Sequence, residues 1–197
     1  MNMFLNLLSA ALYVMLFQNL IFNGGYGLSE AVRMSAKPRQ LLPMAVFITV
    51  FSTLTSAICV LVDFIPFIKN LNEVVHALIY VGILLLIYVI IMIAVNIYGK
   101  VQPATKRRIG IAAFNTLVLA MPLINYRSAF TVVESIGAGL GAGLAYIIAV
   151  LLINNGLKKL DSNTKIPKCF KGTPAIFIYT GILSLAFTGI SGTSVFI

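Results

Sequence analysis

Charged side chains are scarce in this 197-residue chain, and their scarcity argues against an ordinary soluble domain. Only 10% of the residues are charged, whereas soluble domains carry about 25%. Hydrophobic residues make up 60% of the sequence, and the mean hydropathy is +1.02. This composition is typical of a protein that crosses a bilayer several times, and it leaves no room for a separate soluble domain.

Motifs for catalysis and metal binding are also missing. The chain has one histidine and two cysteines, with no CxxC, no HExxH and no GxGxxG after a strand, which argues against a self-contained enzyme. Cys59 lies within an apolar segment and is expected to pack as a small apolar residue. Cys169 lies in a basic loop, far along the membrane normal, so no disulfide between the two is expected.

The few acidic residues lie near the ends of hydrophobic segments. Asp63 is interpreted as an interfacial cap, and Glu73 and His76 as an interfacial pair three residues apart. Glu134 is interpreted as interfacial as well. It is nevertheless the best-placed acid for a cation pathway, because an acid inside a bilayer is a functional candidate.

Basic residues concentrate in three alternate loops of the five that six spans would create. The second and fourth loops hold only Lys69 and Arg127, and the odd loops hold Arg33, Lys37, Arg39, Lys100, Lys106, Arg107, Arg108, Lys158, Lys159, Lys165, Lys168 and Lys171. Basic loops stay on the cytoplasmic side, so both termini are expected on the outer face of the cell membrane. The net charge of +9 then reflects topology, and nucleic acid is not an expected partner.

The hydrophobic pattern predicts an all-α integral membrane protein with a single polytopic domain over residues 1–197. The N-terminal segment lacks a basic region before its apolar run and is interpreted as a retained span. Six transmembrane helices are predicted, at about residues 4–23, 41–67, 74–98, 109–125, 131–153 and 174–195.

Spans one and four are the irregular ones, with polar residues inside them and glycine or proline near their ends. QNLI at 18–21 is similar to FNTL at 114–117. Interrupted segments at matching places in two halves predict a 3+3 inverted repeat with broken helices one and four. Candidate transport-pathway residues are Asn19, Asn23, Asn115 and Glu134. For Asn19 and Asn115, interhelical hydrogen bonding is an equally good interpretation.

Glycine occupies every second position from Gly137 to Gly143 in span five. Small residues let helix backbones approach closely, so this stripe predicts tight helix packing, and a direct ligand role is the alternative.

Three stretches resemble one family of membrane subunits. FKGTPA at 170–175 and SLAFTGISG at 184–192 are similar to the last span of the RnfA/RnfE and NqrD/NqrE subunits, and NTLVLAMPLIN at 115–125 is similar to their fourth span. The resemblance implies a subunit of a redox-driven pump that moves electrons between ferredoxin or NADH and NAD or quinone, together with sodium ions or protons. It also implies other redox subunits and a paired, opposite-facing homologous partner. The basic odd loops resemble the RnfA/NqrE type.

The same resemblance implies a cofactor, a 2Fe–2S cluster held at the subunit interface by two cysteines from each partner. Here Ser29 and Thr116 stand at the cysteine positions. Because a hydroxyl is a poor substitute for a thiolate, no cluster is expected on this chain alone. The expected function is therefore a scaffold or ion path within such a complex. The alternative is a stand-alone transporter or channel built on the same fold.

Overall fold

The computed structural model describes residues 2–99 and 101–192, where all regular structure is helical. Within these residues, five helices are long and apolar enough to cross a membrane: Pro38–Asp63, Glu73–Ile97, Pro103–Arg127, Val132–Ser162 and Thr173–Ser191. Met3–Phe17 is apolar but shorter. These helices confirm the predicted all-α class. The expected end of the last span at 193–195, the C-terminus and Lys100 lie outside the described residues.

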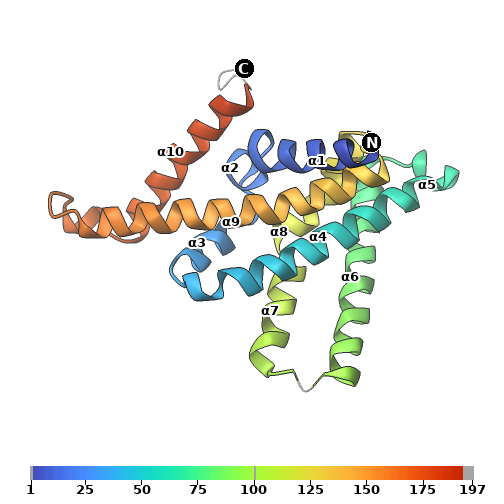
Figure 1. Ribbon diagram of the computed structural model, residues 1–197, viewed down its shortest axis with the longest axis horizontal. Helices are drawn as coiled ribbons and strands as arrows, with labels where there is room; N and C mark the ends of the chain where they lie inside the picture. The colour runs from blue at the N-terminus through green and yellow to red at the C-terminus, as the bar shows by residue number, and fades with distance from the viewer. Residues whose placement is uncertain (1, 100, 193–197) are drawn as a thin grey trace.

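The chain runs through ten α-helices within the described residues (Figure 1). They are α1 (Asn2–Leu12), α2 (Leu20–Gly24), α3 (Leu28–Ser35), α4 (Leu41–Asp63), α5 (Pro66–Lys69), α6 (Glu73–Tyr98), α7 (Pro103–Ala113), α8 (Thr116–Arg127), α9 (Val132–Ser162) and α10 (Thr173–Ser191). A π-helical turn, η1 (Tyr13–Phe17), follows α1, and short 3-10 turns η2 (Pro38–Gln40) and η3 (Lys168–Phe170) precede α4 and α10.

Helix ends differ from the predicted spans where hydropathy and helix do not coincide. The segment expected at 41–67 ends as a helix at Asp63, and Pro66 begins α5, because proline suits a first helical turn and not a helix interior. The segments expected at 109–125 and 131–153 are longer, since helix extends to Pro103 and Ser162 through polar residues. Hydropathy marks the bilayer-compatible part of a helix, not its ends.

The long helix α9 forms the centre of the molecule, with α4 and α1 packed along it (Figure 1). The alternating glycines of α9 face α1 and α4 by turns. A Cβ on Gly137 or Gly141 would collide with the α1 backbone at Leu7 or Ala11, and one on Gly139 would lie 2.6 Å from the α4 backbone at Thr53. The predicted close packing of this stripe is therefore confirmed.

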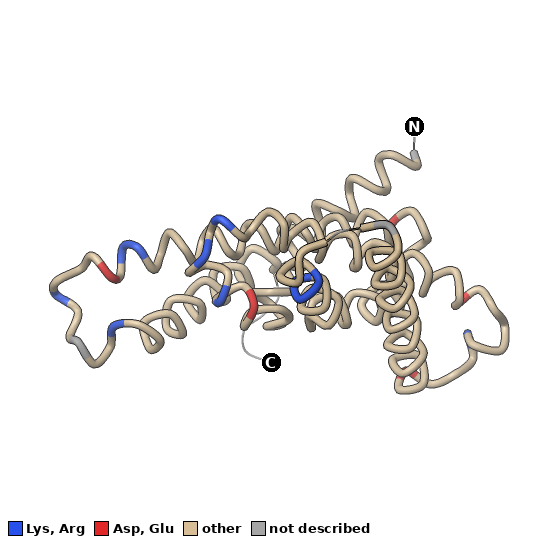
Figure 2. Tube along the Cα trace, turned by 90° about the horizontal axis from the view of Figure 1, so that it is seen from below, with Lys and Arg blue, Asp and Glu red and all other residues tan. Residues whose placement is uncertain are grey.

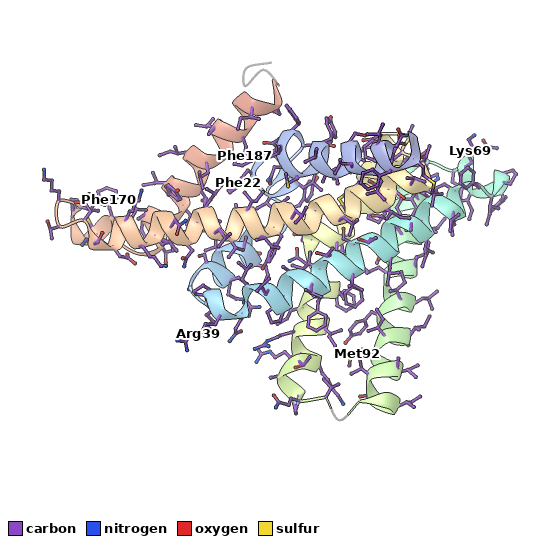
Figure 3. The ribbon with its side chains drawn as sticks, in the orientation of Figure 1. Phe22, Arg39, Lys69, Met92, Phe170 and Phe187 are labelled. Atoms are coloured by element: carbon purple, nitrogen blue, oxygen red, sulfur yellow. The ribbon has the colours of Figure 1, made fainter. Side chains whose placement is uncertain are left out.

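Two parts of the structure leave much apolar surface uncovered. Helix α6 forms a hairpin with α7 and α8 that projects from the α4–α9 layer, and α10 leaves the opposite side (Figure 1). Leu78 on α6 and Phe177 on α10 are both about two-thirds exposed. Helix α10 is anchored to α2 where Phe187 stacks on Phe22 at a ring-centroid distance of 4.6 Å (Figure 3). Exposed apolar faces of this kind suit lipid or a neighbouring subunit.

The α9 contact leads to a stability prediction. Gly141→Ala is expected to destabilise the protein by about 1–3 kcal/mol, because the added methyl group forces α1 away from α9. Gly82→Ala on α6 is the matched control, since nothing lies within 4 Å of its Cβ position, and it should be neutral or stabilising by up to about 1 kcal/mol. Thermal unfolding in detergent measures both. Equal stability of the two variants would contradict the packing role.

Candidate functional site

Two interruptions of the helical backbone lie against each other. The first is the turn between α2 and α3, and the second is the junction between α7 and α8. The backbone N–H of Gly27 donates a hydrogen bond of 2.8 Å to Oγ1 of Thr116. Gly27 is left-handed (φ 76°), and a Cβ there would lie 2.8 Å from Oδ1 of Asn115 and 3.1 Å from Cβ of Leu117. This contact therefore requires glycine for both its conformation and its space.

An asparagine begins a helix at two breaks in the chain, Asn19 between η1 and α2 and Asn115 between α7 and α8. Oδ1 of Asn19 accepts hydrogen bonds from the backbone N–H groups of Ile21 and Phe22, and Oδ1 of Asn115 accepts one of 2.9 Å from Leu117. Asparagine is a favoured N-cap because its side chain satisfies N–H groups that lack a helical partner. The two residues differ in their amide nitrogens. Nδ2 of Asn19 donates to the Met15 carbonyl, whereas Nδ2 of Asn115 is buried without a hydrogen-bond partner.

A cavity of about 240 Å³ opens beside this junction. Its lining residues are Ser29, Glu30, Ile111, Phe114, Asn115 and Thr116. The structure thus brings the two positions of the expected cluster cysteines, which are far apart in sequence, to one site. Both carboxylate oxygens of Glu30 accept hydrogen bonds from Arg33, at 2.6 and 2.8 Å, and the hydrogen-bonded carboxylate raises the pKa of Arg33. The only acid in the lining is therefore already paired.

The donor atoms of this cavity do not fit an iron–sulfur cluster. Such clusters are held by cysteine thiolates, and the cavity offers the hydroxyls of Ser29 and Thr116, of which the second already binds Gly27. Cys59 is buried within α4 and Cys169 is exposed near α10; both are free thiols, and neither lines the cavity. In the part of the chain that the structure describes, no group of three or more His, Cys, Asp or Glu side chains could hold a metal ion.

The other candidate pathway residues lie elsewhere. Asn23 is exposed, donates to the Phe17 carbonyl and lines a separate cavity beside α10. Glu134 forms the capping box of α9 with Thr131 and borders an apolar groove between α9 and η1. Asn19 is fully buried with its polar atoms bound to nearby backbone. Of the four, only Asn115 lines the cavity at the junction.

The sequence interpretation missed a polar cluster at another end of the molecule. His76 was expected to pair with Glu73, but it faces Asp63 on α4, with 3.7 Å between Nε2 and Oδ1. Glu73 instead forms an ion pair with Arg127 on α8. Asp63 ends one span and His76 begins the next, so the hairpin brings them together. The closeness of the two span ends in sequence is the signal that could have revealed this pairing.

The Gly27 contact can be tested with two neighbouring glycines. Gly27→Ala is expected to lower stability by about 1–3 kcal/mol more than Gly25→Ala, because only the Gly27 methyl group would press on Asn115. Gly25 has a similar positive φ of 70° but open space around its Cβ position, so it controls for backbone strain. Unfolding monitored in detergent gives the difference. Equal losses would show that the two interruptions are not in tight contact.

Comparison with known proteins places this chain in a family. The family described as Rnf-Nqr subunit, membrane protein, matches residues 7–194. A relative from Rhodobacter capsulatus, named as a subunit of an ion-translocating oxidoreductase complex, is 28% identical over 94% of this chain and 94% of its own length. A subunit of a Na⁺-translocating ferredoxin:NAD⁺ oxidoreductase complex from Acetobacterium woodii is 25% identical over 88% and 91%. A subunit of a proton-translocating ferredoxin:NAD⁺ oxidoreductase complex from Clostridium ljungdahlii is 35% identical over 55% and 58%. With its several membrane-length helices, the chain is a multi-pass membrane protein that belongs to the Rnf-Nqr subunit family.

Proposed function

We propose that this chain is a membrane subunit of an ion-translocating electron-transport complex of the Rnf/Nqr type, with a scaffold or ion-path role. The similarity to three relatives that are named as subunits of such complexes supports this assignment. The observation that carries the proposed role is the junction at Gly27 and Thr116, where two interrupted helices meet. Backbone is left non-helical at membrane depth only where protein or a polar cavity satisfies it.

We further propose that the fold is a 3+3 inverted repeat with broken helices one and four. Both segments restart at an asparagine N-cap, Asn19 before α2 and Asn115 before α8. Six crossings require α1, η1 and α2 to act together as one broken span. In transporters built from inverted repeats, broken helices of this kind surround the transported ion.

The proposed orientation places both termini on the outer face of the cell membrane. Its support is the distribution of charge, because the basic residues gather over the left and middle of the molecule in Figure 2. Basic loops are retained in the cytoplasm. An opposite-facing homologous subunit would then cover the cavity that Ser29 and Thr116 line, and other subunits of the complex would bind at its margins.

The cavity chemistry favours an ion path over electron transfer through this chain. With hydroxyls in place of thiolates, the chain supplies no sulfur ligand at the junction. Asn115 offers a buried amide N–H group without a protein partner that can hold a water molecule, and the carbonyl groups at the end of α7 can face a cation. The relatives' names include both Na⁺ and the proton, so transport assays should follow both.

A pair of Asn115 variants separates an ion-path role from simple helix capping. Asn115→Ser retains a good N-cap but removes the amide, so it should assemble normally yet lose coupled ion uptake into membrane vesicles. Asn115→Leu should lose uptake as well and cost about 1 kcal/mol of stability through the lost cap. Normal uptake by the Ser variant, with a defect only in the Leu variant, would show that Asn115 is merely a cap.

Iron analysis tests the proposed absence of a cluster on this chain. The native complex should contain redox subunits but no cluster signal, by EPR and acid-labile sulfide, that maps to this cavity. Ser29→Cys combined with Thr116→Cys should still bind no cluster in the isolated subunit, since two thiolates of a usual four are then present. A cluster at this interface in the native complex, or in the isolated double variant, would contradict the proposal.

A stand-alone transporter on the same fold is the second candidate, and the missing thiolates favour it. Purification under mild conditions distinguishes the two. Flavin- or iron–sulfur-bearing subunits that co-purify with this chain support the complex, whereas ion transport by this chain, alone or with one homologous copy, supports the transporter.

A further inference from the structure

Asp63 and His76 form the centre of a polar cluster enclosed by three helices. His76 on α6 is fully buried, and the side chain of Asp63 at the end of α4 is 16% exposed. Tyr80 donates a hydrogen bond of 2.6 Å from its hydroxyl to Oδ2 of Asp63. The ring of Tyr126 on α8 stacks on the His76 ring at a centroid distance of 4.3 Å. None of these contacts involves the cavity at the helix junction.

The hydrogen bonds determine which nitrogen of His76 carries a proton when the ring is neutral. Nδ1 lies 3.1 Å from the backbone carbonyl oxygen of Asn72. A carbonyl oxygen can only accept, so Nδ1 must donate, and Nε2 of a neutral ring then carries a lone pair. Nε2 faces Oδ1 of Asp63 at 3.7 Å, and neither atom has another hydrogen-bond partner. Two acceptors thus point at each other in a buried site.

One additional proton resolves this arrangement. On Nε2 it converts the ring to an imidazolium that can donate to Oδ1, after the two atoms approach by about 0.5–1 Å to normal hydrogen-bond length. The pair then carries no net charge, whereas without the proton it is a buried carboxylate with one unpaired oxygen, which is costly. The Tyr126 face also attracts a positively charged ring at this distance.

A cavity borders the Asp63 side of the pair. About 260 Å³ in volume, it is lined by Val60, Asp63, Phe64, Lys69, Asn125, Tyr126, Ala129 and Phe130. Asn125 is fully buried, and neither its amide nitrogen nor its oxygen has a protein partner. Such groups bind water when space allows, so the cavity offers a route for protons to Asp63. Lys69, exposed in the lining, is the last residue of α5 (Figure 3).

We propose that Asp63 and His76 form an exchangeable proton-binding site, which holds one proton between Oδ1 and Nε2 and receives it through this cavity. The charged and titratable groups around the pair are Cys59 on α4, Lys69 on α5, Glu73 and Tyr80 on α6, and Tyr126 and Arg127 on α8. Glu73 and Arg127 neutralise each other, and Lys69 disfavours a metal cation in the same cavity. The site does not depend on the proposed electron-transport function.

The single histidine of the chain makes this proposal directly measurable. With ¹⁵N-labelled histidine in nanodiscs at pH 7, both ring nitrogens of His76 should give imidazolium signals. Asp63→Asn, which keeps the size of the side chain, should abolish those signals and leave a neutral ring. Glu73→Gln is the matched control, because Glu73 precedes His76 by one helical turn but pairs with Arg127, and it should leave the imidazolium signals unchanged.

Infrared spectra complete the test, since the shared proton can reside on either partner. A protonated-carboxyl band that Asp63→Asn removes would show the proton on Asp63 and support the site. A neutral wild-type ring without that band would overturn the proposal, and so would imidazolium signals that persist in Asp63→Asn. If Asp63→Asn fails to fold, the wild-type NMR and infrared spectra alone decide whether the pair holds the proton.

Discussion

The structure depends on one constraint, the need to satisfy backbone hydrogen bonds wherever a helix is interrupted inside a low-dielectric environment. The breaks before α2 and α8 meet this need with their own side chains, and the turn between α2 and α3 meets it through the α7–α8 junction. Asn19 and Asn115 supply acceptors to the first N–H groups of the helices that follow them. Thr116 supplies the acceptor for Gly27 across the junction. This last hydrogen bond also joins the α2–α3 turn and the α7–α8 junction into a single site.

Helix α9 holds this junction in place. Its small residues bring the backbones of α1 and α4 close on two sides, and α3 packs on it as well. Close packing is the main source of helix association in a membrane. Lipid tails are as apolar as the side chains, so the hydrophobic effect does not drive the helices together. The peripheral helices α6 and α10 bury far less of their surface, which suits contact with lipid or other subunits.

The site at the junction lacks sulfur ligands, although its geometry joins the two positions where the family resemblance places them. Ser29 and Thr116 share one cavity. The Thr116 hydroxyl already accepts a hydrogen bond from the backbone N–H of Gly27. A buried acid–histidine contact lies instead at the α4–α6 hairpin, where Asp63 and His76 face each other. The helix junction and the Asp63–His76 pair are thus two separate sites.

Composition, spacing and short motifs are local properties, and they were enough to predict the helical membrane class, the close packing of the glycine stripe and the family. Asn19 and Asn115 carry the helix-capping preference in their own side chains, and each begins a helix in the structure. The folded chain was needed to show that Gly141 faces α1 while Gly139 faces α4, and that His76 pairs with Asp63 and not with Glu73. These contacts join different helices, and the same sequence pattern is compatible with other pairings of those helices. Only the three-dimensional packing decides the partner of each of these residues, because a closely packed interior leaves each side chain room beside one particular neighbour.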